Sequence, residues 1–292
     1  SGGTITVLGF VIGVLVFIAY RVFYLQSTAF LVEILAILVV ILLLSCIGLV
    51  DDLFGWQHGG LSRRSRLILV AISAIPLMVL NAGKSTMLIP FIGIVDFGYI
   101  YPLLILPIGV VGATTTFNFL AGYNGLESGQ GILLLSTLAA ISFLTGNSWL
   151  GVIALCMVFA LFAFLIFNFY PAKVFPGDSL TYAIGGMIAV LAIIGNFEKI
   201  AIFIFFPYIL ETILKLRGGL VKQSFGKPQA DGSLNLNYDK IYGLEHLSIY
   251  LMLKAGIKPT ERKVVFSLWA FQIILIIIAL VMFERGIFYG IR

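Results

Sequence analysis

Charge is what this sequence has least of. Only 11% of its 292 residues are charged and 61% are apolar, whereas a soluble domain carries roughly 25% charged residues. This composition excludes an ordinary water-soluble enzyme, and the apolar content also excludes a disordered chain. Glycine shows no three-residue period, which excludes collagen.

Cysteine and histidine are also scarce, with two of each. Two cysteines are too few for a disulfide scaffold, and both lie in apolar runs, so they cannot join His58 and His246 in a zinc site. The sequence contains no Ser-His-Asp arrangement, no dinucleotide fingerprint and no base-reading module. The net charge of +5 therefore does not indicate nucleic acid as a partner.

Nine apolar runs are long enough to cross a bilayer, which takes about 20 residues. They cover 4–24, 28–50, 65–82, 99–118, 130–146, 149–169, 179–196, 198–216 and 264–283. The sequence thus predicts an all-α integral membrane protein, a multi-pass helical bundle with nine spans. No soluble domain remains, so we expect one transmembrane domain over residues 1–292.

The basic residues predict which face of this bundle lies inside the cell. If the spans alternate sides, 13 of the 18 Lys and Arg residues lie on one face, and the positive-inside rule makes that face cytoplasmic. The outer loop at 83–98 contains Pro90 and Gly93 and predicts a small hairpin on the membrane. The longest polar stretch, 217–263, is a cytoplasmic loop before the last span, with one short amphipathic helix at 243–255.

Polar residues that are not basic gather at the ends of spans on the cytoplasmic face. They are Asp51, Asp52, Asn118, Asn124, Glu127 and Asp178. Carboxylates and amides from separate spans therefore converge at one membrane surface. A membrane enzyme with one water-soluble and one lipid substrate would be built in this way.

The first of these sites is the adjacent pair Asp51 and Asp52, directly after an apolar run. Two carboxylates at the C-terminal end of a helix repel each other and the helix dipole. A divalent metal or a basic side chain would offset that cost. The alternative is a solvated pair that only marks the membrane interface.

The second site is the run Asn118-Phe-Leu-Ala-Gly-Tyr-Asn124-Gly-Leu-Glu127-Ser-Gly-Gln130, with three glycines and no Lys or Arg. Glycines let backbone amides approach a ligand, and a helix beginning near Gln130 would favour an anion. The run is not a P-loop. A plain glycine-rich turn between two helices is the alternative.

The third site is Phe175-Pro-Gly-Asp178-Ser at the start of a span. In isolation, Asp178 is expected to cap its own helix. Together with Asn118, however, it supplies the hard oxygen ligands that Mg²⁺ prefers. Phe175 could stack on a base, although an aromatic ring at the interface needs no ligand to explain it.

Three arginines, Arg63, Arg64 and Arg66, lie between the acidic pair and the next span. They act as topological anchors, and neutralising Asp52 or gripping phosphate is compatible with that role. Glu211 lies within an apolar run, where snorkelling or pairing is expected in preference to catalysis.

The three motifs occur in an order and spacing that resemble the polyprenyl-phosphate N-acetylhexosamine-1-phosphate transferases over nearly the whole chain. The Asn-Gly-Leu-Glu form at 124–127 and the sequence Lys-Pro-Thr-Glu261-Arg262 before the last span are closer to the eukaryotic and archaeal UDP-N-acetylglucosamine:dolichyl-phosphate branch than to the bacterial peptidoglycan translocase. The resemblance implies that a polyprenol phosphate attacks the β-phosphate of a UDP-sugar and releases UMP.

The resemblance also assigns roles to residues. Asn118 and Asp178 would hold Mg²⁺, with Mn²⁺ as a substitute. Asp51, Asp52 and Arg64 would form the catalytic group that positions or activates the lipid phosphate. The nucleotide would contact Gly122, Asn124, Glu127 and Phe175, with Phe175 stacked on uracil, and Trp56 and His58 are candidates for contacts with the sugar.

This chain departs from the family pattern in three places. The family has ten spans, so the first helix is expected to be absent here. The lysine expected after the acidic pair is replaced, with Arg64 as the nearest match. The Arg- and His-rich motif that recognises the sugar in eukaryotic members is absent from 222–240.

The sequence therefore predicts transfer of N-acetylglucosamine-1-phosphate from UDP-N-acetylglucosamine to dolichyl or another polyprenyl phosphate. Another UDP-N-acetylhexosamine or undecaprenyl phosphate stays open as the substrate. Rivals of other classes are a secondary transporter, which also has intramembrane acids, and a non-catalytic scaffold. We expect a cytoplasmic site, a homodimer as the candidate assembly, and an archaeal cell membrane in preference to the endoplasmic reticulum.

Overall fold

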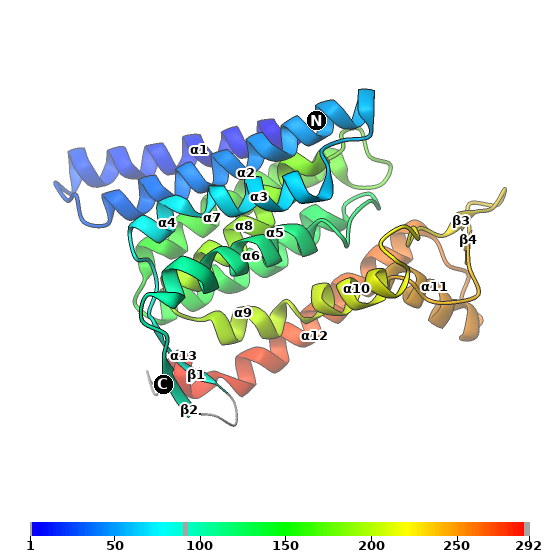
Figure 1. Cartoon of the computed structure of the whole chain (residues 1–292). Coiled ribbons are helices and arrows are strands. Elements are labelled where there is room, and N and C mark those ends of the chain that lie inside the picture. Colours follow the sequence, from blue (N-terminus) through cyan, green and yellow to red (C-terminus); the bar gives the residue numbers. More distant parts are fainter. Residues whose placement is uncertain (1, 90–92, 289–292) are drawn as a thin grey trace.

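The computed structural model describes residues 2–89 and 93–288 and is mostly helical (Figure 1). In chain order the elements are α1 (Gly2–Ala19), η1 (Tyr20–Tyr24), α2 (Leu31–His58), α3 (Arg63–Ser73), α4 (Ile75–Val79), β1 (Thr86–Ile89), β2 (Gly93–Asp96), η2 (Tyr101–Ile105), α5 (Leu106–Phe117), α6 (Leu126–Leu144), α7 (Ser148–Asn168), α8 (Gly177–Gly195), α9 (Glu198–Ile204), α10 (Phe206–Arg217), β3 (Lys227–Pro228), β4 (Leu234–Asn235), α11 (Leu244–Lys254), α12 (Glu261–Met282) and α13 (Glu284–Phe288). The strands form two antiparallel pairs, β1 with β2 and β3 with β4.

Within the described residues, six helices are long and apolar enough to cross a membrane. They are α1 together with η1, and α2, α6, α7, α8 and α12. Helices are suited to this environment because their backbone hydrogen bonds are satisfied within each segment. The chain is thus a multi-pass helical membrane protein, as its composition predicts.

The predicted spans at 65–82, 99–118 and 198–216 fall on shorter helices. The first divides at Ala74 between α3 and α4, the second joins η2 to α5, and the third divides at Phe205 between α9 and α10. Each contains a proline in the first turn of a helix. Proline lacks an amide hydrogen and favours the start of a helix over its continuation. The count of nine spans stays a prediction.

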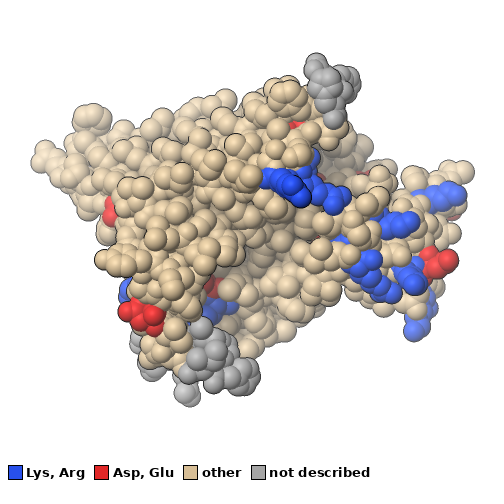
Figure 2. All heavy atoms as spheres, in the orientation of Figure 1, with Lys and Arg blue, Asp and Glu red and all other residues tan. Residues whose placement is uncertain are grey.

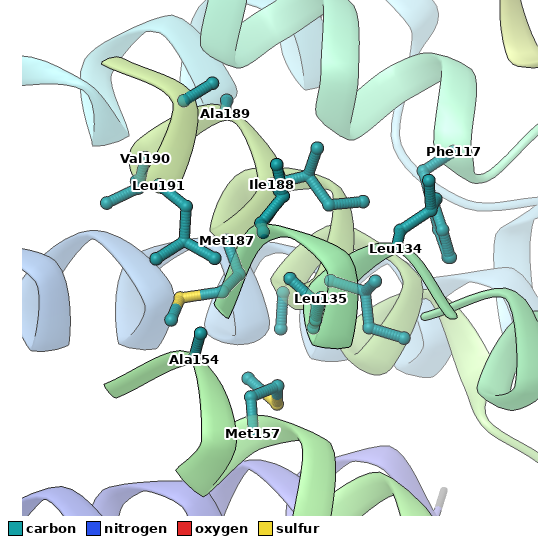
Figure 3. Packing of buried hydrophobic residues seen from close by; sticks show 14 of the residues in the cluster. Phe117, Leu134, Leu135, Ala154, Met157, Met187, Ile188, Ala189, Val190 and Leu191 are labelled. Carbon is teal, nitrogen blue, oxygen red and sulfur yellow. The ribbon is translucent and has the colours of Figure 1, made fainter. Parts of the chain in front are cut away.

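Helix α8 lies at the centre of the bundle and is buried along most of its length. Figure 3 shows Met187 of α8 beside Leu135 of α6 and Met157 of α7, in one continuous apolar core. Helix α5 comes especially close, because a Cβ added to Gly185 would lie 2.7 Å from the Ala113 carbonyl oxygen. Small residues permit such close backbone contact in membranes. This packing fixes α8 against the helices that carry the other candidate site residues.

The two ends of the bundle differ in charge. Helices α2, α5 and α7 end where α3, α6, α8 and α12 begin (Figure 1). Most of the Lys and Arg atoms in view gather at this end and over α10 and α11 (Figure 2). Strands β1 and β2 pair within 83–98, and α11 lies within 243–255. The position of the hairpin on the outer membrane surface and the amphipathic character of the helix stay predictions. The assignment of the basic end to the cytoplasm stays a prediction.

Candidate active site

Asp51 lies two turns before the end of α2, not at the helix end as predicted, because α2 continues to His58. Its side chain is 1% exposed, and Arg66 Nε lies 2.6 Å from Oδ2. The Leu61 amide donates to Oδ1 over 2.7 Å, and the Tyr182 hydroxyl donates to Oδ2 over 3.4 Å. Asp51 therefore has the basic partner that offsets the cost of burying a carboxylate.

Asp52 binds the N-terminus of α8. Its Oδ1 accepts from the Asp178 amide over 2.7 Å, and its Oδ2 accepts from the Ser179 amide over 3.4 Å. Gly48, one turn earlier on α2, makes this approach possible because a Cβ there would overlap the Asp178 backbone. A carboxylate stabilises the unpaired amides and the dipole at a helix N-terminus.

Because Asp52 caps α8, Asp178 does not do so, and the side chain at the N-cap position makes no capping hydrogen bond either. The sequence alternative in which Asp178 only caps its own helix is therefore wrong. The Asp178 carboxyl lies beside that of Asp51, and the charges of Asp52 and Arg66 are also close enough to act on it. Three carboxyl groups from two helices thus meet with one nearby guanidinium.

A cavity of about 290 Å³ opens at this point. Its lining includes all six residues predicted to bind metal or nucleotide: Asn118, Gly122, Asn124, Glu127, Phe175 and Asp178. They come from the end of α5, the segment between α5 and α6, the start of α6, the loop before α8 and the start of α8. The structure therefore brings together the second and third motifs, whose residues lie up to 60 positions apart in the sequence, and their individual roles stay predictions.

Asn118 ends α5 and is joined to α8. Its Oδ1 accepts from the Thr181 hydroxyl over 3.1 Å, and Thr181 also lines the cavity. Thr181 follows Asp178 by three residues, so both face the same side of α8. This hydrogen bond orients the Asn118 amide toward the part of the cavity where Asp178 lies.

The glycine-rich segment 118–125 is held by side-chain oxygens. The Gly122 amide donates to Glu127 Oε1 over 2.6 Å, and the Asn124 amide donates to Glu261 Oε1 over 2.7 Å. The sequence predicts that amides of this segment approach a bound ligand, but these two are already paired within the chain. Helix α6 also begins earlier than expected, at Leu126.

Asn168, at the end of α7, is a cavity residue that the sequence analysis missed. Its Oδ1 accepts from the Gly125 amide over 3.2 Å and from the Ser128 hydroxyl over 2.8 Å, while its Nδ2 donates to the Val174 carbonyl over 3.0 Å. It is fully buried and ties together the two loops that carry the second and third motifs. A lone amide at the end of a long apolar run was the signal that could have found it.

The other predicted site residues lie differently. Arg64 is exposed and makes no polar contact in the described part of the chain, whereas Arg66, two residues further along α3, binds Asp51. Phe175 is 62% exposed, which leaves its ring available for stacking. Trp56 and His58 lie in α2, but their side chains are outside the described residues.

Residues 34–196 match the family described as glycosyl transferase family 4. The chain belongs to this family. The match runs from α2 to the end of α8, so it contains every residue of the cavity lining. The resemblance inferred from the three motifs is therefore confirmed.

Relatives within the family carry specific names. A Saccharolobus solfataricus protein, provisionally named UDP-N-acetylglucosamine--dolichyl-phosphate N-acetylglucosaminephosphotransferase, is 38% identical over 243 residues, 82% of this chain and 72% of that protein. The protein of this name from Dictyostelium discoideum is 27% identical over 250 residues, 74% and 59% of the two chains. The phospho-N-acetylmuramoyl-pentapeptide-transferase of Halalkalibacterium halodurans is 30% identical over 221 residues, 73% and 67% of the two chains.

The family resemblance implies a divalent metal, and the cavity can be tested for one. No group of three or more His, Cys, Asp or Glu side chains among the described residues is arranged to hold a metal ion. Asn118 and Asp178 nevertheless supply oxygen donors to one cavity. Mg²⁺ characteristically binds one or two carboxylates together with water and substrate phosphates. The donor set therefore fits Mg²⁺ shared with a diphosphate.

A second buried cluster lies beside the cavity and anchors the loop 217–263. Glu211 of α10 accepts from the Leu244 amide at the start of α11 over 2.6 Å and from the Ser224 hydroxyl over 3.3 Å, and Lys215 Nζ lies 3.6 Å away. Of the two sequence alternatives for Glu211, snorkelling or pairing, the structure shows pairing. Glu245 is fully buried beside it, and neither of its carboxyl oxygens has a hydrogen-bond partner among the described residues.

We expect Glu245→Gln to stabilise the protein, and more so at high pH. Burial, and then the charge of Glu211, raise the pKa of Glu245 well above its usual range, against the opposing effect of Lys215. The folded state therefore binds more protons than the unfolded state above about pH 4.3, and stability falls as pH rises. The neutral amide does not titrate, so the variant avoids this pH-dependent loss.

Thermal unfolding of the purified protein at pH 5 and pH 8 measures this effect. The Tm of the variant should exceed that of the unaltered protein by several degrees at pH 8, and by less at pH 5. A difference that is equal at the two pH values, or reversed, would contradict a proton-binding role for Glu245.

Proposed function

We propose that this protein transfers N-acetylglucosamine-1-phosphate from UDP-N-acetylglucosamine to dolichyl or a similar polyprenyl phosphate and releases UMP. The observation that carries the proposal is a cavity at the basic end of a helical membrane protein. The second and third motifs line this cavity, and Asp52 of the first motif binds the Asp178 amide at its edge. The names of the relatives with 27–38% identity support the same donor and acceptor. A transporter site would lie near mid-membrane between repeats, whereas this cavity lies at the ends of the helices.

The nucleotide half of the donor would occupy the side of the cavity formed by the segment 118–125 and Phe175. The exposed ring of Phe175 offers a face on which uracil can stack. Asn124 and Gly122 would contact uridine from the opposite side, while Glu127 and Asn168 keep their backbone in place. The diphosphate would then point toward Asp178.

Asn118 and Asp178 would hold Mg²⁺, with Mn²⁺ able to substitute. The bound ion would neutralise the charge of the diphosphate, which is the main requirement in phosphoryl transfer. Asn118 is oriented for this task by Thr181. The Asp178 carboxylate has its position set through the α8 backbone, which Asp52 holds.

Asp51 and Asp52 would act in this site by positioning. Their oxygens bind Arg66 and the α8 amides, so neither is arranged as a free base.

A lipid phosphate is already ionised near neutral pH, so no strong base is needed. In the transfer, an oxygen of the lipid phosphate forms a bond to the β-phosphorus of the UDP-sugar. The bond from that phosphorus to the α,β-bridging oxygen breaks, and UMP leaves with the bridging oxygen. Arg66, whose side chain is 33% exposed, would approach the incoming phosphate.

The proposal places the cavity on the cytoplasmic side of an archaeal cell membrane. The gathering of Lys and Arg at that end supports this orientation through the positive-inside rule. It also retains the nine spans predicted from the sequence, with the three interrupted helices crossing as pairs, and a homodimer as the candidate assembly. Breaks in membrane helices are tolerated where the freed backbone groups find other partners.

A panel of UDP-sugars against one polyprenyl phosphate tests the function. The purified protein should release UMP from UDP-N-acetylglucosamine only when both the lipid phosphate and Mg²⁺ are present. Chelation of divalent ions should abolish release, and Mn²⁺ should restore part of it. Preference for another UDP-N-acetylhexosamine would change the substrate but keep the chemistry. Absence of lipid-dependent UMP release from every donor would contradict the proposal.

A further inference from the structure

Glu261 reaches the nucleotide segment from the far end of the chain. It lies in the first turn of α12, and its Oε1 accepts from the Asn124 amide, 137 residues away, over 2.7 Å. On the other side of Asn124, Glu127 accepts from the Gly122 amide. Two carboxylates from different helices thus bind alternate amides of one cavity wall. Hydrogen bonds to charged groups are stronger than those between neutral groups, so each is a substantial constraint.

The loop 217–263 contacts the same wall at a second point. The Gly226 amide donates to the Tyr123 hydroxyl over 2.8 Å, and the Phe225 ring packs edge-on against Tyr123 at 5.6 Å between centroids. Phe225 also lies over Gly122, where a Cβ would overlap its ring. Burial raises the pKa of Tyr123 to about 12, so its hydroxyl stays protonated. The chain from Gly226 to Glu261 is therefore attached to the nucleotide segment at both ends.

We propose that Glu261 is a positioning residue that couples the loop 217–263 to the nucleotide site. It holds the Asn124 amide, and through it the backbone of the cavity wall, only when α12 and the loop before it are in place. Nucleotide affinity then depends on the order of a loop that contributes no residue to the cavity lining. The kinetic consequence rests on the proposed function, whereas the contact itself does not.

A purely structural role makes different predictions. An acidic residue in the first turn stabilises a helix through its dipole, and α12 already has Thr260 as its N-cap, accepting from the Lys263 amide. If Glu261 did no more than this, its loss would lower the Tm and loosen the start of α12. It would leave the segment 118–125 and the KM for UDP-sugar unchanged.

The test compares Glu261→Ala and Glu261→Gln with Asp239→Ala in the full-length chain in detergent. Asp239 is an exposed acid in the same loop and makes no polar contact in the described residues, so it controls for the change of charge. Hydrogen exchange is followed separately in peptides covering 119–125 and 260–266. KM and kcat are measured with UDP-N-acetylglucosamine as the varied substrate.

In Glu261→Ala, exchange in 119–125 should rise about tenfold, and KM should rise about tenfold with a smaller change in kcat. Glu261→Gln keeps an acceptor oxygen and should return both values to within about threefold of the unaltered protein. The control should match the unaltered protein. Unchanged exchange in 119–125, or an unchanged KM, overturns the positioning role. If the unaltered protein shows no turnover, the proposed function fails, and the exchange rates alone decide the role of Glu261.

Discussion

Replacing Asp178 with alanine should abolish turnover while the protein still inserts into the membrane and folds. Asp178 is the carboxyl group of the three-acid cluster that lines the cavity. Removal of one preorganised group that stabilises charge in a transition state costs about a hundredfold to a thousandfold in rate. The loss here should reach at least that level, because the same side chain is proposed to hold the metal.

Stability should not fall in this variant, which separates it from an ordinary folding defect. The α8 N-terminus is capped by Asp52 through the backbone amide of residue 178, and alanine keeps that amide. The variant also removes one of three neighbouring carboxyl groups that repel each other. UMP release and thermal unfolding should be measured on the same preparation. Robust turnover by Asp178→Ala would count against the metal assignment, and a large fall in Tm would count against the capping role of Asp52.

Replacing Arg66 with alanine should have the second largest effect, on both stability and activity. The change would leave the Asp51 carboxylate buried without its charged partner. Breaking a buried ion pair costs about 3–5 kcal/mol, and the lower end applies because the Arg66 side chain is one-third exposed. Displacement of Asp51 beside Asp178 should also slow turnover by about a hundredfold.

The neighbouring arginine provides the comparison. Arg64→Ala removes the same charge from the same helix, but Arg64 makes no polar contact in the described residues, so its effect on Tm should be several degrees smaller. Asp51→Asn combined with Arg66→Ala should recover much of the lost stability, because no buried charge is then left unpaired. Thermal unfolding and UMP release of the four proteins test this. A larger loss from Arg64→Ala than from Arg66→Ala would contradict the structure and favour the assignment made from sequence.

The helical membrane class and the convergence of the cavity residues were predictable from sequence for one physical reason. In a chain that crosses the membrane repeatedly, polar residues at the ends of alternate apolar runs must return to the same surface. Asn118, Phe175 and Asp178 could therefore be grouped before their distances were known. Residues missed within this group, such as Asn168, occupy the same kind of position but lie outside a recognisable motif.

Other features depend on geometry that the sequence does not encode locally. Arg64 and Arg66 are equivalent in composition, and the turn between α2 and α3 decides which of them reaches Asp51. The contact of Glu261 with Asn124 joins positions 137 residues apart, and the capping of α8 by Asp52 depends on close packing at Gly48. Hydropathy also predicted continuous spans at 65–82 and 198–216, where prolines begin new helices.

The most direct test follows the β-phosphorus of the donor. UDP-N-acetylglucosamine labelled with ³²P at the β-phosphate is incubated with the protein, polyprenyl phosphate and Mg²⁺, and the lipid and aqueous phases are separated. Transfer of sugar-1-phosphate predicts that the label moves into the lipid as a pyrophosphate while unlabelled UMP appears in equal amount. Release of the label as UDP would mean that the sugar alone is transferred and would contradict the account.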